Sequence, residues 1–132
     1  MIFVDSNVPM YLIGQEHPHK RDTIVLLDRL ASEKRKLVSS AEVFQELLHR
    51  YSAIHRDEDI QVAFDALYGL IEEIFPVLKE DVFNAKDLVL RYPKLSARDA
   101  VHAAQMKRLK IETVFSFDRG FDIVPGIKRI PQ

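Results

Sequence analysis

Residues 2–5 read Ile-Phe-Val-Asp, a short apolar run that ends in an acid. Consecutive apolar residues with β-branched and aromatic side chains predict a strand that is buried on both faces. A similar run near the other end of the chain, Val114-Phe115-Ser116-Phe117-Asp118, also ends in an acid. Strands of this kind are typical of a parallel sheet that is covered by helices on both sides.

The spacing of apolar residues between these two runs predicts that strands and helices alternate along the chain. We therefore expect one α/β domain over residues 1–132, built as a five-stranded parallel sheet flanked by helices on both faces. The expected strands are 2–4, 37–39, 77–78, 113–117 and 127–130. One helix is expected to begin near Asn7, and another to follow Ser39 and end at Tyr51. The other expected helices are 21–35, 60–74, 81–91 and 96–109.

The composition fits a cytoplasmic protein with a full hydrophobic core. The chain has 132 residues, of which 47% are apolar, and its formal net charge is -1. The absence of cysteine excludes a disulfide-stapled fold, a thiolate metal site and a cysteine nucleophile. No apolar run approaches the roughly 18 residues of a membrane span, and no signal-peptide pattern is present, so we expect no membrane association.

Four acids from separate segments are candidates for a common site. Ligands of parallel sheets bind beyond the carboxyl ends of the strands, where the strand order reverses, so Asp5 and Asp118 face one crevice if their strands flank that point. Glu46 and Asp99 lie on predicted helices. Each acid also has a structural explanation: an Asp after a strand can start a turn, Asp99 can cap its helix, and Glu46 can pair with Arg50 at i,i+4 spacing.

Glu42 and Glu46 lie one turn apart on the same predicted helix and need to be distinguished. Ser39 and Glu42 match a capping box, which gives Glu42 a local structural role. Glu46 has no such role, and we take it as the candidate site acid. Neutralising Glu46 should then leave stability unchanged or raise it, because a repulsive charge is removed.

Clustered carboxylates need protons or a cation. At ~4 Å and an effective dielectric constant near 20, each like-charge pair costs about 4 kcal/mol. Oxygen ligands without Cys or His select a hard divalent ion such as Mg²⁺ or Mn²⁺, and an acidic site in a mildly basic surface suits a nucleic-acid substrate. The histidines show no metal-ligand spacing, and only His102, on the predicted helix of Asp99, is a candidate to support the site.

Four motifs in order carry a resemblance to a known family. They are Ile2-Phe-Val-Asp5-Ser-Asn7, Ser39-Ser-Ala-Glu-Val-Phe-Gln-Glu46-Leu, Leu95-Ser-Ala-Arg-Asp99-Ala-Val-His-Ala-Ala104 and Val114-Phe-Ser-Phe-Asp118-Arg-Gly-Phe121. In this order, and in a chain of this length, they resemble the PIN-domain ribonucleases, and among these the VapC-like toxins of toxin–antitoxin pairs. The resemblance covers the whole chain.

The resemblance implies a PIN-like fold and a metal-dependent endoribonuclease that hydrolyses RNA. It implies that Asp5, Glu46, Asp99 and Asp118 are the catalytic acids and hold Mg²⁺ or Mn²⁺. Asn7 and Ser116 match polar positions that line such sites, and Asp122 matches an auxiliary acid. The implied partners are RNA, a cognate antitoxin and a second copy of the chain in a homodimer.

Three other functions remain open from the sequence. The same site could process RNA without an antitoxin. A receiver-like signalling domain also carries acids at strand ends, but it requires a Lys at a late strand end, and Lys128 lies inside its predicted strand. A degenerate domain that only binds protein is the third alternative, although this chain retains all the acids.

Overall fold

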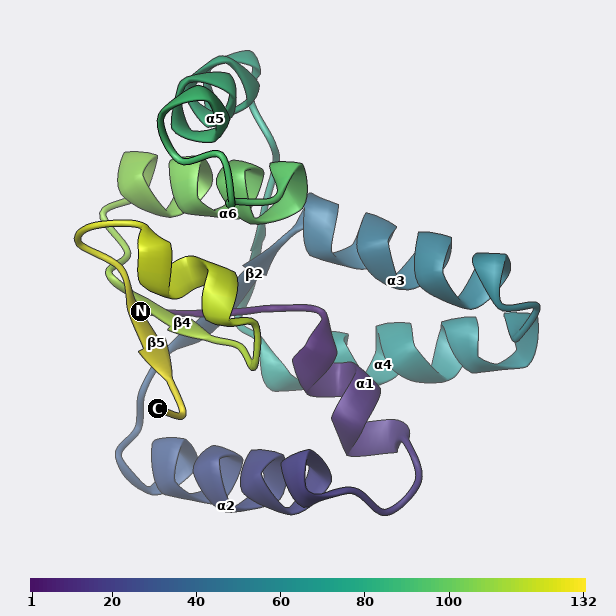
Figure 1. The fold of residues 1–132 in the computed structure, drawn as a ribbon. Helices are drawn as coiled ribbons and strands as arrows, with labels where there is room; N and C mark the ends of the chain where they lie inside the picture. The colour runs from purple at the N-terminus through teal and green to yellow at the C-terminus, as the bar shows by residue number, and fades with distance from the viewer.

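The computed structural model describes residues 1–132 and contains one five-stranded parallel sheet (Figure 1). The strands are β1 (Ile2–Val4), β2 (Leu37–Ser40), β3 (Glu73–Phe75), β4 (Thr113–Phe115) and β5 (Lys128–Ile130). Their spatial order is β3-β2-β1-β4-β5, and every neighbouring pair is parallel. The strand order therefore reverses between β1 and β4, where Val4 is paired with Phe115. The predicted fold class is confirmed.

Helices cover the sheet on both sides. In Figure 1, α2 lies below the sheet and α5 and α6 lie above it, while α3 and α4 extend away from it together. The helices are α1 (Asn7–Ile13), α2 (Pro18–Ser32), α3 (Ala41–Ala53), α4 (Ile60–Leu70), α5 (Lys79–Arg91) and α6 (Ala97–Arg108), with 3-10 turns η1 (Asp57–Asp59) and η2 (Arg119–Ile123). None of these helices is both long enough and apolar enough to cross a membrane.

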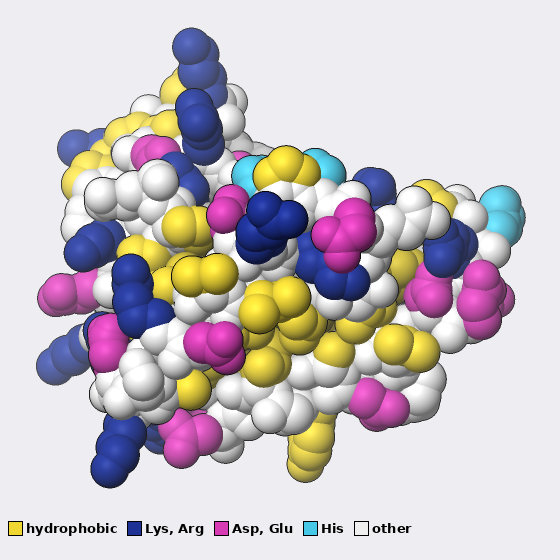
Figure 2. All heavy atoms as spheres, turned by 90° about the horizontal axis from the view of Figure 1, so that it is seen from below, with side chains coloured by type: hydrophobic (Ala, Val, Ile, Leu, Met, Phe, Trp, Pro, Cys, Tyr) yellow, Lys and Arg dark blue, Asp and Glu magenta, His cyan; other side chains and the backbone are white.

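The central strands form the core, as the apolar runs predict. Ile2, Phe3 and Val4 are completely buried, and so are Val114 and Phe115 on the neighbouring strand. Burying side chains of this size contributes about 1.5–3 kcal/mol each. The outer surface is mixed: Figure 2 shows hydrophobic side chains among charged ones on the face seen from below. The buried core of the sheet thus includes β1 and β4 up to their carboxyl ends.

The third strand was predicted at the wrong place. Strand β3 is Glu73–Phe75 rather than 77–78, and the preceding helix ends at Leu70 rather than at residue 74. Ile71 and Ile74 fit helical spacing, but Ile71 is already extended, with φ of -110° and ψ of 152°. Because β3 is a partly exposed edge strand, it lacks the continuous apolar run that marks the central strands.

The start of α3 also differs from the expectation. Ser40, not Ser39, caps this helix, since its hydroxyl accepts a hydrogen bond from the backbone N–H of Val43 at 3.4 Å. Ser39 instead donates from its hydroxyl to the carbonyl of Val4 at 2.8 Å and ties β2 to β1. Strand β2 runs one residue further than predicted, so the proposed capping box with Glu42 does not form.

Candidate metal centre

The site lies at the carboxyl ends of β1 and β4, where the strand order reverses. Asp5 directly follows β1, and Asp118 follows β4 after a short turn. Glu46 comes from the second turn of α3, and Asp99 comes from the first turn of α6. Asp5, Glu46 and Asp99 are buried, with exposed fractions of 4%, 6% and 6%, whereas Asp118 is exposed at the rim.

A hydroxyl network fixes the carboxylate of Asp5. The backbone N–H of Ser6 donates to Asp5 Oδ1 at 2.7 Å, and the hydroxyl of Ser116 donates to Asp5 Oδ2 at 2.6 Å. Ser116 Oγ also accepts hydrogen bonds from the backbone N–H of Asp118 at 3.0 Å and from Asn7 Nδ2 at 3.2 Å. Ser116 and Asn7 therefore join the end of β1 to the turn that carries Asp118.

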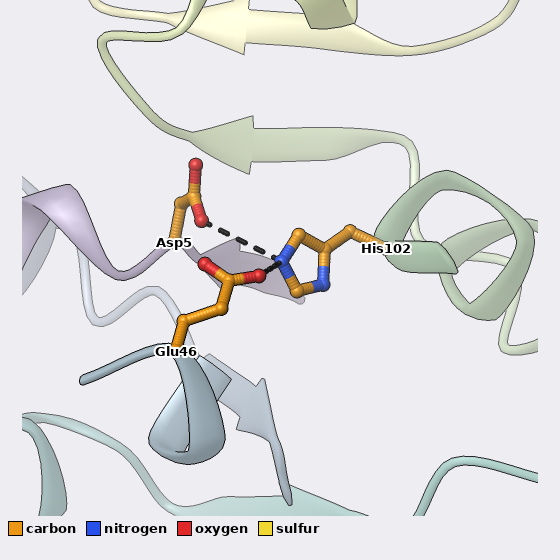
Figure 3. Close-up of side chains that lie close together, drawn as sticks. All are labelled: Asp5, Glu46 and His102. Carbon is orange, nitrogen blue, oxygen red and sulfur yellow. Dashed lines mark hydrogen bonds and ion pairs between the residues drawn. The ribbon is translucent and has the colours of Figure 1, made fainter. Parts of the chain in front are cut away.

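Glu46 and Asp5 converge on a histidine (Figure 3). His102 Nε2 lies 2.5 Å from Glu46 Oε1 and 3.7 Å from Asp5 Oδ1, while the hydroxyl of Ser6 donates to Glu46 Oε2 at 2.8 Å. His102 is completely buried, and its Nδ1 has no hydrogen-bond partner. The only polar contacts of the His102 ring are therefore those with Glu46 and Asp5.

The pKa values of Glu46 and His102 follow from this contact. Burial alone would lower the pKa of His102, but the hydrogen bond to Glu46 and the nearby Asp5 charge raise it to about 8. Burial would raise the pKa of Glu46, but the bond to His102 outweighs burial and lowers it. In the absence of a metal ion, His102 is thus an imidazolium that balances part of the negative charge.

Asp99 and Asp118 form a second pair of acids. Burial, together with the neighbouring Asp118, raises the pKa of Asp99 to about 8, and burial also raises the pKa of Asp5. A Cβ atom at Gly120 would lie 2.7 Å from Asp99 Oδ2 and 3.1 Å from Asp118 Oδ1, so only glycine lets the backbone approach both carboxylates. At neutral pH, a proton is retained at Asp99.

These side chains have the chemistry of a divalent metal centre. One ligand atom each of Asp5, Glu46 and His102 lies within 4.8 Å of the others, which is close enough for a single ion. Carboxylate oxygens suit Mg²⁺ and Mn²⁺. A cation would offset the burial and the repulsion between acids that together raise the pKa of Asp5 and Asp99.

The structure brings together all four acids named from the sequence, together with Asn7 and Ser116. It places Asp122 elsewhere: its carboxylate accepts two hydrogen bonds from Arg129, at 3.0 and 3.2 Å, and no hydrogen bond or ion pair links it to the four acids. Sequence reasoning underestimated His102, which lies at the centre of the cluster. Its position three residues after Asp99 on a helix places both on one face, and this spacing was the available signal.

Comparison with known proteins identifies the family. The model described as PIN domain matches residues 2–127. Ribonuclease VapC13 of Mycobacterium tuberculosis (strain ATCC 25618 / H37Rv) is 55% identical over 130 residues, covering 98% of this chain and 99% of that protein. The crystal structure of the Sarcin-Ricin loop cleaving toxin VapC20 of Mycobacterium tuberculosis matches with a TM-score of 0.73 and 18% identity, covering 90% of this chain and 91% of that one. VapBC2 from Rickettsia felis, bound to a DNA fragment from its promoter, matches with a TM-score of 0.73 and 20% identity over 98% of this chain and 97% of that one. The chain therefore belongs to the PIN-domain family and, within it, to the VapC ribonucleases.

Proposed function

We propose that this protein is a metal-dependent endoribonuclease that hydrolyses RNA phosphodiester bonds and acts as the toxin of a toxin–antitoxin pair. The observation that carries the proposal is the convergence of four acids, from β1, α3, α6 and the turn after β4, at the reversal point of the sheet. The 55% identity to a protein named as a ribonuclease supports the same activity. Carboxylates that share one site need protons or a cation, because their like charges repel.

Asp5, Glu46, Asp99 and Asp118 would hold the ion, for which we propose Mg²⁺, with Mn²⁺ as a substitute. A divalent cation in such a site lowers the pKa of water to supply a nucleophile and offsets the charge that develops at phosphorus. The donor set fits, because it is dominated by carboxylate oxygens and its repulsion is compensated only in part by His102.

The other residues of the site orient these acids. Ser116 and the backbone of Ser6 hold both oxygens of Asp5, and the hydroxyl of Ser6 with His102 holds both oxygens of Glu46. Carboxylates fixed in this way need little reorganisation when a charged substrate arrives, which is the electrostatic advantage of a preorganised site. Asp99 retains a proton at neutral pH and releases it when a cation takes its place.

Exposed cations beside the acids are suited to contact RNA phosphates. The charge of Arg98, on α6, lowers the pKa of Glu46, which places its positive charge close to the site. Arg119 directly follows Asp118 and is also exposed. Arginine contacts of this kind position a nucleic-acid backbone without reading its sequence.

The proposal extends to the partners and location that the VapC family implies: a cognate antitoxin, a second copy of the chain and the cytoplasm. Exposed apolar side chains on α5, among them Val82, Phe83 and Leu90, offer a surface for protein contact. Light scattering of the purified chain tests the homodimer, and a mass near 15.3 kDa would reject it.

The direct test of the activity is cleavage of a mixed pool of single-stranded RNA, with and without Mg²⁺, followed by mapping of the new ends. We expect internal cuts that require the ion and are lost in Asp118→Asn. The control is Asp122→Asn, which removes an acid that pairs with Arg129 instead of joining the four acids and should retain cleavage. Equal cleavage in EDTA, or by Asp118→Asn, would reject the proposal.

A further inference from the structure

A cluster of four aromatic and imidazole rings begins at Phe117, the residue before Asp118. The ring of His17 stacks on Tyr11, with centroids 5.0 Å apart and planes at 30°, and His19 stacks on Phe117 at 4.3 Å and 19°. Tyr11 presents its edge to His19 at 5.0 Å and to Phe117 at 5.3 Å. The four residues come from α1, the loop before α2, the start of α2 and the turn after β4. We call them the ring cluster.

The ring cluster is fastened to the proposed metal centre. Phe117 lies between Ser116 and Asp118 in the chain, and its backbone N–H donates to Asn7 Oδ1 at 3.3 Å. Asn7 also contacts Ser116, and Tyr11 lies four residues further along α1, on the same helix face as Asn7. The ring cluster thus begins one residue from Asp118 and extends away from it along α1.

His17 is held rigidly and still exposed. Its Nδ1 accepts a hydrogen bond from the backbone N–H of His19 at 3.0 Å and caps the start of α2, so the proton of the neutral ring is on Nε2. One face of the ring lies on Tyr11. His17 is exposed, although the ring of His19 also lies near it, with centroids 5.0 Å apart and planes at 55°. Figure 2 shows several histidine side chains on the surface of the protein. A ring fixed by a cap and a stack loses little conformational entropy when a flat ligand binds.

The surroundings of His17 indicate a neutral ligand rather than a phosphate. A hollow of about 430 Å³ adjoins it, lined by Glu16, His17, Pro18, Arg21 and Asp22. The two carboxylates would repel a phosphate, but they are good acceptors for the exocyclic amino group of a nucleobase. The guanidinium of Arg21 can donate to a base edge or stack on it.

We propose that the Tyr11–His17 stack, at the end of the ring cluster away from Asp118, is a subsite for one unpaired nucleobase of the RNA substrate. This inference rests on the proposed ribonuclease function and assigns a place to a base that flanks the scissile bond at a distance. Unpaired RNA bases are commonly recognised by stacking on aromatic and histidine rings, while paired bases are not accessible for such contacts.

The test separates the ring of His17 from its capping role. His17→Asn removes the ring but retains a side chain that is favoured at a helix N-cap. His55→Asn makes the same change at an exposed histidine beyond the far end of α3, at a φ of 58° that Asn tolerates.

The probe is a set of short single-stranded RNAs that carry fluorescent 2-aminopurine at successive positions. Binding is measured with Ca²⁺ as the cation, and a gel checks that the RNA remains intact. We expect the wild-type protein to quench one position strongly. His17→Asn should abolish that quenching and raise Kd by about 5- to 150-fold, the usual effect of losing one base stack. His55→Asn should match the wild-type protein.

Unchanged quenching and Kd in His17→Asn would overturn the subsite, and so would a wild-type complex in which no position is quenched. Either result, found together with metal-dependent RNA cleavage, leaves the proposed ribonuclease function intact. Absence of cleavage by the wild-type protein would count against the proposed function instead, because the binding measurement does not depend on cleavage.

Discussion

Replacing Asp99 by Asn should stabilise the metal-free protein, although it removes a proposed metal ligand. Burial and Asp118 raise the pKa of Asp99 to about 8, which means that ionisation of this carboxyl opposes folding. Asn is neutral at every pH. Its amide can donate a hydrogen bond to Asp118, which the carboxyl of Asp99 can do only when it is protonated. The substitution therefore removes an unfavourable charge without leaving a cavity.

The magnitude follows from the difference between the folded and unfolded pKa values. The unfolded value is about 3.9, so the wild-type protein loses stability as the pH rises from about 4 to about 8, at about 1.4 kcal/mol per pH unit. With a folded pKa of about 8, Asp99 thus lowers the free energy of unfolding of the wild-type protein by at most about 4 kcal/mol at pH 7. We expect a gain of about 2–4 kcal/mol for Asp99→Asn at pH 8 and about 1 kcal/mol at pH 5.

Urea unfolding in EDTA between pH 5 and pH 8 measures this difference. The control is Asp87→Asn, which removes an exposed acid on α5 and should change stability by less than about 0.5 kcal/mol at any pH. Adding Mg²⁺ should stabilise the wild-type protein much more than Asp99→Asn. A destabilised Asp99→Asn variant, or a gain that does not grow with pH, would refute the assigned electrostatics.

Three further predictions follow from the same contacts. Because the hydrogen bond to His102 lowers the pKa of Glu46, Glu46→Gln should reduce metal-free stability by about 1–3 kcal/mol and abolish cleavage. Glu42→Gln should change neither property. Urea unfolding and the RNA cleavage assay decide between the two acids. Buried Asp81 accepts hydrogen bonds from Arg108 at 2.7 and 3.0 Å, and together with the bond from the backbone N–H of Leu78 they outweigh burial and lower the pKa of Asp81. Asp81→Asn should therefore lose about 2 kcal/mol at pH 7, and the loss should shrink as the pH falls below about 4, because the unfolded wild-type chain then takes up a proton that the folded carboxylate does not; a loss of equal size at pH 3 would contradict this. Calorimetry of Mg²⁺ binding should show tighter binding and less proton release at pH 8 than at pH 6.5, because protons compete for the same acids; affinity independent of pH would contradict the pKa assignments.

Much of the fold was predictable because the central strands are buried on both faces. The runs at 2–4 and 113–117 are largely apolar, and this property predicted a parallel sheet. That the first and fourth strands flank its reversal point was a condition of the predicted site, and the observed strand order meets it. The edge strand was not predictable in the same way, since Ile71 and Ile74 also fit a helix. The predicted cap of α3 was wrong by one residue. Ser39 and Ser40 are equally good caps in sequence, and only the hydrogen bond from Ser39 to β1 distinguishes them.

The candidate acids were predictable from their places after strands and on helices, but their electrostatic interplay was not. Sequence reasoning expected neutralisation of Glu46 to leave stability unchanged or raise it. The structure gives the opposite sign, because Glu46 contacts His102 and its charge is favoured by the fold. Ionisation is instead unfavourable at Asp99, because this carboxyl is buried and faces Asp118. Such distinctions depend on distances between segments that lie far apart in the chain.

The central claim is that the four acids form a divalent metal centre, and diffraction from crystals grown with Mn²⁺ tests it most directly. Mn²⁺ scatters anomalously, so its position is seen independently of the protein atoms. We expect an anomalous peak within about 2–2.5 Å of carboxylate oxygens from at least Asp5 and one of Glu46, Asp99 and Asp118. The peak should be absent in Asp5→Asn crystals. A well-ordered site with no peak in saturating Mn²⁺, or a peak bound only at other residues, would contradict the claim.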